Sequence, residues 1–126
     1  MAREPSAREQ VLALRENLLE FLVHGVRYAF PAVRGRVTRG VPTAHSAPVL
    51  ASRLQGGESG ALVWPFAEGR ARGESLEPLH RGVPRAAAEH PDMYEALALV
   101  DASRVGGARV RELAVELLRQ RLLETS

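Results

Sequence analysis

Residues 7–30 carry apolar side chains at the spacing of an α-helix, arranged in two neighbouring rows. Side chains three or four positions apart share one side of a helix, so the segment predicts a single long helix with a broad apolar face. Ser6 is its expected N-cap, with Glu9 as the partner in a capping box, and Pro31 is expected to end it. The first row consists of Val11, Leu14, Leu18 and Leu22, and the second of Leu12, Leu19, Val23, Val26 and Phe30.

Two apolar rows cover more of this helix than one small domain needs to bury. Helices of this kind often pair across a two-fold axis, which brings the same surface of both copies into contact. Gly25 lies inside the predicted helix at a cost of about 1 kcal/mol relative to alanine, so we expect a bend or a close contact there. We expect a homodimer, with an interface that contains Val11, Leu14, Leu18, Phe21 and Leu22.

The chain as a whole predicts a single, mostly helical α+β domain that spans residues 1–126. With 126 residues, of which 45% are hydrophobic, it can form one core. Glycine and proline divide the sequence after the first helix into short elements. These are a basic irregular segment at 31–46, a short helix at 47–54, a small β-hairpin at 61–76 with Trp64 as its core anchor, and helices at 84–89, 92–104 and 108–123.

The last two predicted helices are joined by Gly106 and Gly107, which raises the question of a helix-turn-helix. Asp92 is the expected N-cap of the first of these helices, with Glu95 as its capping-box partner. The outer face of residues 108–123 interleaves arginines with glutamates, and glutamates would repel phosphates. We therefore expect an antiparallel helical hairpin with charge pairs on its surface rather than a helix that reads DNA.

Nothing in the sequence has the pattern of a catalytic or metal site. The absence of cysteine excludes disulfides, thiol catalysis and cysteine-ligated zinc. Two polar clusters occur, Thr43 with His45 and Ser46, and His90 with Asp92 and Glu95. The first lacks an oriented nucleophile and base, and the second has too few ligands for a metal ion. We expect no catalytic residue, no metal, no cofactor and no enzymatic activity.

Composition also indicates an origin and a location. All 17 basic residues are arginine and isoleucine is absent, which is typical of a GC-rich bacterial genome. The charged start of the chain does not resemble a targeting signal. A membrane span needs about 20 apolar residues, and no such run occurs. We expect a cytoplasmic bacterial protein that does not associate with membranes.

Positive charge is concentrated in the middle of the chain. Residues 27–85 contain nine arginines and four glutamates, a net charge of +5, and residues 27–53 contain no acid. Local positive potential attracts phosphates or acidic partners. The alternative is a solvated surface, because arginine would serve on any surface of this chain. The predicted contacts to nucleic acid or an acidic partner are Arg27, Arg34, Arg36, Arg39 and Arg53.

Several stretches of the sequence resemble one group of proteins. They are LLEFLVHGVRYAFP at 18–31, RGVPTAH at 39–45, VWP at 63–65 with RG at 72–73 and EPL at 77–79, and DMYEALALVDA at 92–102. Together they resemble the C-terminal region of uncharacterised bacterial winged-helix proteins described as transcriptional-regulator-like. A winged-helix DNA-binding domain precedes this region in such proteins, whereas six residues precede the first predicted helix here. We expect the companion domain without the winged helix.

The resemblance implies a role in dimerisation, partner contact or ligand sensing. Joined to the charge pattern, it predicts a non-enzymatic regulator-type domain that acts through dimerisation and through contact with a partner or, weakly, with nucleic acid. The alternative is an antitoxin-like protein that binds and neutralises a partner enzyme.

Overall fold

The computed structural model describes residues 4–54 and 60–124, which form a mostly helical α+β fold. The predicted fold class is confirmed, with a long N-terminal helix, a small sheet and two long C-terminal helices. In chain order the elements are α1 (Ala7–His24), α2 (Val26–Ala29), β1 (Arg34–Pro42), the 3₁₀ turn η1 (Ala44–Ser46), α3 (Pro48–Ala51), β2 (Leu62–Pro65), β3 (Ala71–Leu76), α4 (Val83–Glu89), α5 (Pro91–Val105), α6 (Ala108–Arg119) and the π turn η2 (Gln120–Glu124).

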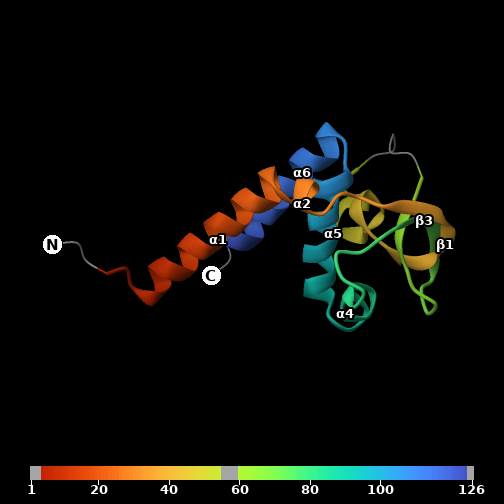
Figure 1. Cartoon of the computed structure of the whole chain (residues 1–126), viewed down its shortest axis with the longest axis horizontal. Coiled ribbons are helices and arrows are strands. Elements are labelled where there is room, and N and C mark those ends of the chain that lie inside the picture. The colour runs from red at the N-terminus through yellow and green to blue at the C-terminus, as the bar shows by residue number, and fades with distance from the viewer. Residues whose placement is uncertain (1–3, 55–59, 125–126) are drawn as a thin grey trace.

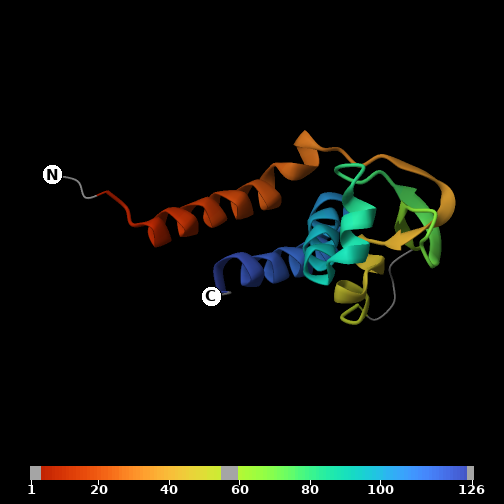
Figure 2. The ribbon, with the colours of Figure 1, turned by 90° about the horizontal axis from the view of Figure 1, so that it is seen from below.

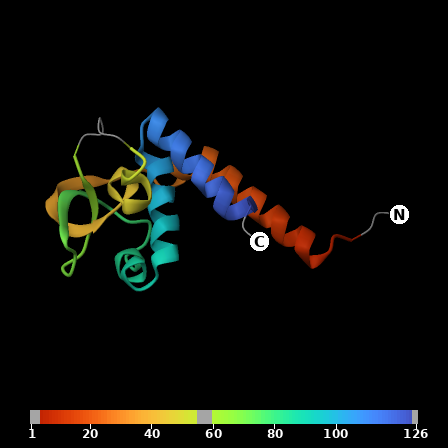
Figure 3. The same cartoon turned by 180° about the vertical axis from the view of Figure 1, so that it is seen from behind.

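The sheet lies at one end of the molecule and α1 extends from the other (Figure 1). Helix α5 stands between the two ends, and α1 and α6 run side by side away from it, as the view from behind also shows (Figure 3). The first turns of α1 reach beyond the end of α6 (Figure 2). The two ends of the molecule therefore present separate surfaces.

The predicted start and bend of the first helix are confirmed. The hydroxyl oxygen of Ser6 accepts a hydrogen bond from the backbone N–H of Glu9 at 3.1 Å. The helix divides at Gly25, where an added Cβ would lie 2.9 Å from the ring of Phe21. Apolar side chains of the C-terminal half of α1 pack against α5 and α6. This core includes Leu19, Leu22, Val26, Leu99, Leu117 and Leu118.

The sheet corrects two predictions. Residues 34–42, within the segment predicted to be irregular, form β1, which pairs antiparallel with both β2 and β3. The predicted strands near 61–76 exist, but β2 and β3 run parallel to each other instead of forming a hairpin. Each strand pairs with the other two, so the sheet closes into a small barrel.

Two glycines explain how so few strands can close. A Cβ at Gly40 would lie 2.0 Å from the carbonyl oxygen of Trp64, and one at Gly73 would lie 2.7 Å from that of Ala61. Only glycine allows such close approach of backbones. The glycines of residues 31–46 favoured an irregular segment in the sequence analysis. In the structure, Gly40 of β1 permits close packing of the strands.

The helix boundaries differ from prediction at three places. Helix α5 begins at Pro91, with His90 at the N-cap position, so Asp92 does not cap it. Proline suits the first helical position because its missing N–H needs no partner there. The helical segment predicted at 47–54 shortens to α3 after η1, and α6 continues into a π turn.

A buried carboxylate connects the sheet to the helices. Asp101 Oδ2 on α5 accepts hydrogen bonds from Thr43 Oγ1 at 2.8 Å and from Trp64 Nε1 at 2.7 Å. Its Oδ1 lies 3.1 Å from Arg104 Nη2, and both side chains are at most 3% exposed. Burial raises the pKa of Asp101, and the charge of Arg104 and the hydrogen bonds from Thr43 and Trp64 oppose that shift. Trp64 is thus a core residue, as predicted.

The guanidinium of Arg104 extends this network to two further segments. It donates to the carbonyl oxygen of Phe30 after α2 at 3.1 Å and to that of Glu77 after β3 at 3.0 Å. Asp101 therefore positions, directly or through Arg104, chain segments that lie far apart in the sequence.

We predict that Asp101→Ala lowers the free energy of unfolding by about 3–5 kcal/mol, because it leaves the buried charge of Arg104 unpaired. Urea unfolding measures this loss. Asp92→Ala, an exposed acid on the same helix, is the control and should change stability by less than about 0.5 kcal/mol. Equal stability of the two variants would contradict the role given to Asp101.

A second prediction concerns Tyr94, whose hydroxyl donates to the carbonyl oxygen of Pro42 at 2.6 Å. Burial raises the pKa of Tyr94 to about 12, above its ordinary value of 10.0. As the pH rises, the unfolded chain therefore loses this proton before the folded chain does. The contribution of Tyr94 to the free energy of unfolding is fully present below about pH 10 and is lost as the pH rises towards 12. Tyr94→Phe should flatten this fall in urea unfolding, and Tyr28→Phe, at a tyrosine that is 73% exposed, should not.

Candidate functional site

Two arginines stand directly opposite each other on the sheet. In the antiparallel pairing of β1 with β3, Arg39 faces Arg72, and both are exposed. Opposite residues on one face of a sheet have Cβ atoms about 4.5–5.5 Å apart. At their neighbours Gly40 and Gly73, an added Cβ would point towards adjacent backbone. Because side chains alternate along a strand, Arg39 and Arg72 point away from the barrel.

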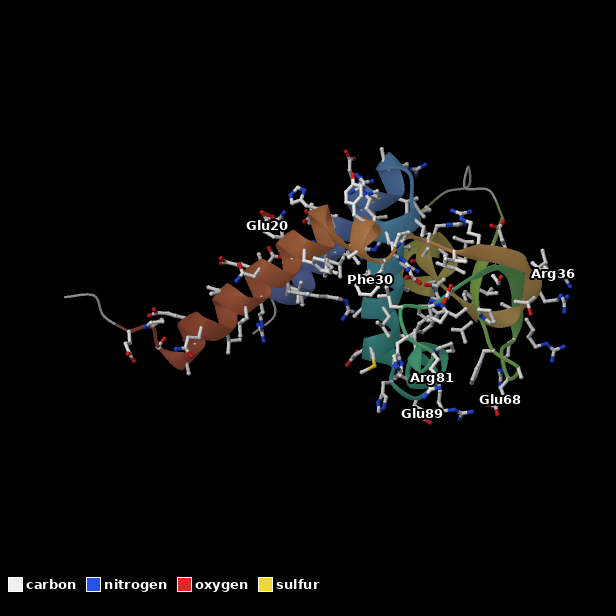
Figure 4. The ribbon with its side chains drawn as sticks, in the orientation of Figure 1. Glu20, Phe30, Arg36, Glu68, Arg81 and Glu89 are labelled. Atoms are coloured by element: carbon white, nitrogen blue, oxygen red, sulfur yellow. The ribbon has the colours of Figure 1, made fainter. Side chains whose placement is uncertain are left out.

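A third arginine lies nearby on β1. The pairing register of β1 with β3 shifts between Arg34 and Val37, as at a β-bulge, and Arg36 lies within this shift. Figure 4 shows its side chain directed to solvent at the end of the molecule opposite α1. Bulges redirect side chains and commonly occur beside binding sites. We call Arg36, Arg39 and Arg72 the arginine surface.

Glu74, two positions after Arg72 on β3, pairs with an arginine outside the arginine surface. It lies 3.6 Å from Arg34 Nη1. In the described part of the chain, no ion pair joins a member of the arginine surface to a carboxylate. The surface therefore retains its positive charge.

The structure brings together some of the predicted contact residues and separates others. Arg34, Arg36 and Arg39 all lie on β1. Arg27 lies on α2, with its guanidinium 5.4 Å from the ring centre of Tyr28, and Arg53 lies in the turn after α3. Sequence reasoning missed Arg72 because β1, its partner strand, was not predicted.

A second candidate surface lies on α1. Four of the predicted interface residues form an exposed apolar row at intervals of three, four and three positions. The fifth, Leu22, does not belong to this exposed row, because it is only 7% exposed and packs in the core of its own chain. The exposed row consists of Val11 (46% exposed), Leu14 (68%), Leu18 (46%) and Phe21 (40%).

The first polar cluster considered in the sequence is engaged in structural contacts. Thr43 binds the buried Asp101, and His45 Nε2 lies 2.6 Å from the carbonyl oxygen of Gly60. Ser46 Oγ accepts a hydrogen bond from the N–H of Leu62 at 2.9 Å. These side chains connect η1 to its neighbours.

The second polar cluster, His90 with Asp92 and Glu95, does not form a shared site. Glu95 pairs with Arg121 of η2, and Asp92 is exposed. Over residues 4–54 and 60–124, no group of three or more histidines and acids is placed to hold a metal ion. In the same residues, no helix combines the length and apolar character needed to cross a membrane.

A cavity of about 260 Å³ lies between the segments after α2 and β3. Phe30, Pro31, Glu77 and Arg104 are among its lining residues. The terminal nitrogens of Arg104 already bind backbone carbonyls and Asp101, so they serve the fold there.

Comparisons of the chain with protein-family models, curated proteins and solved structures find no match. The functional argument therefore depends on the geometry of the two surfaces.

The facing arginines lead to a prediction about stability. Like charges at facing positions of a sheet are unfavourable. A pair of opposite charges at such positions contributes roughly 0.2–1 kcal/mol to stability. Arg39→Glu should therefore raise the free energy of unfolding at low salt, and added salt should diminish the gain. Arg53→Glu makes the same charge change away from the sheet and is the control for urea unfolding. If the control gains as much, the arginine pair does not strain the sheet.

Proposed function

We propose that this chain is a non-enzymatic, regulator-type domain of the bacterial cytoplasm that works as a homodimer and contacts nucleic acid. The observation that carries the proposal is the exposed row on α1. A helix row spaced at three, four and three positions has the pattern of a coiled-coil seam. Such a seam is complementary to the same seam on a second copy, as a two-fold interface requires.

The exposure of the N-terminal half of α1 also favours a partner. Residues 7–18 are all exposed, and this part of the helix extends past α6 (Figure 2). Isolated helices shorter than about 12–15 residues are marginal in water. Packing of a second copy against the exposed row would supply the missing apolar contacts.

The stretches that resemble winged-helix regulators support the proposal by their position. They contain the second half of α1, the end of β1 with η1, and most of α5. They also contain Thr43, Trp64 and Asp101, which form the buried network. The stretches that carry the resemblance thus include residues of the buried network.

An antitoxin-like protein is the second candidate. The projection of α1 from the body favours it, because a projecting helix with an exposed row can enter a groove of a partner enzyme. In that case the row binds another protein, and the chain alone is a monomer.

Light scattering at micromolar concentration separates these proposals. We expect about twice the chain mass of 13.7 kDa. Leu14→Glu, which puts a charge in the middle of the exposed row, should give the monomer mass. Ala13→Glu adds the same charge beside the row and should remain dimeric. A monomeric parent chain would refute the dimer and favour the antitoxin-like candidate.

A further inference from the structure

We infer that the outer face of β1 and β3 binds the phosphates of a nucleic-acid backbone, with Arg39 and Arg72 as a two-sided clamp. This inference rests on the proposed regulator-type function and specifies the residues and the chemistry of its nucleic-acid contact.

The first argument is the arrangement of charge. Arg39 and Arg72 face each other across paired strands, and like charges in that position repel. An anion between them would convert the repulsion into attraction. The guanidinium group presents a planar set of donors that fits phosphate oxygens in pairs, so two facing arginines suit a phosphodiester.

The second argument is that the backbone beneath the arginines is held in place. Each strand of the barrel pairs with the other two. Gly40 and Gly73, next to the two arginines in the sequence, lie against neighbouring backbone. The backbone that carries the arginines is therefore fixed before a ligand binds, so only the side chains lose conformational freedom.

The third argument concerns the form of the ligand. Arg36, at the register shift three positions before Arg39, adds a third cation on β1, and all three side chains are exposed. Three exposed cations on two paired strands suit an extended polyanion better than a single small ion. Phosphate contacts position a protein on a duplex and carry no sequence information. We therefore assign the surface to duplex DNA, without sequence preference.

The position of the surface agrees with the proposed dimer. The arginine surface lies at the end of the molecule opposite α1 (Figures 1 and 4). Pairing through α1 leaves it free in both copies.

Fluorescence anisotropy with a labelled DNA duplex of arbitrary sequence tests the inference at several salt concentrations. The double variant Arg39→Ala/Arg72→Ala should bind more weakly and with a shallower salt dependence. At roughly 0.9 logarithmic units per phosphate contact, a fourfold rise in salt should cost the parent chain about tenfold more affinity than the variant. The matched control is Arg27→Ala/Arg53→Ala, which removes two exposed arginines from other elements and should keep the parent slope.

Equal slopes for the two double variants, or no binding by the parent at low salt, would overturn the inference. A labelled poly-glutamate peptide tests an acidic protein partner. If it binds as tightly as DNA and depends equally on Arg39 and Arg72, the assignment to nucleic acid is wrong. Circular dichroism checks that the variants fold, and Arg39→Glu, expected to stabilise the sheet, should also lose DNA binding.

Light scattering on the same samples separates this inference from the proposed function. If the parent is dimeric and the two double variants bind DNA equally well, the inference is contradicted and the proposed dimer is not. A monomeric parent that still loses DNA binding in Arg39→Ala/Arg72→Ala contradicts the dimer and leaves the phosphate clamp in place.

Discussion

The carboxylate of Asp101 accepts hydrogen bonds from Thr43 and Trp64 and pairs with Arg104, all in the buried interior. A buried charge is costly unless its partners satisfy it, so these groups depend on one another. Trp64 belongs to β2 and Asp101 to α5, so their hydrogen bond fixes the barrel against the helices. Arg104 adds the segments after α2 and β3. The orientation of both candidate surfaces depends on this network.

The two surfaces have different chemistry and lie at opposite ends. Helix α1 presents aliphatic and aromatic side chains, which suit a second helix. The outer face of β1 and β3 presents the arginine surface, and Glu74 on β3 pairs with Arg34 outside it. This division is what the proposed function requires, with association through α1 at one end and contact with a polyanion at the other.

Much of the helical structure could be predicted from local patterns. Ser6 and Gly25 determine where α1 begins and bends, and these signals lie within a few residues of their effects. β1 could not be predicted in this way. Gly40 is typical of a loop in sequence, and its strand role depends on backbone contact with Trp64, which is distant in the chain.

The candidate site was predictable in part for the same reason. Arg36 and Arg39 were found from charge alone, but charge does not show which arginine faces which. Arg72 joins them only through the register of β1 with β3. Leu22 was assigned to the dimer interface because periodicity does not show which of two apolar rows the rest of the chain covers. The role of Asp101 could not be predicted locally, because Thr43 and Trp64, which donate hydrogen bonds to it, lie 58 and 37 positions away.

Arginine footprinting with phenylglyoxal tests the central claim most directly, because all 17 basic side chains of this protein are arginines. Mass spectrometry then reports the accessibility of each one with and without a DNA duplex. We predict that DNA protects Arg36, Arg39 and Arg72, while Arg27 and Arg53 stay reactive. Equal protection of all exposed arginines, or protection of Arg27 and Arg53 without the three on the sheet, would contradict the account.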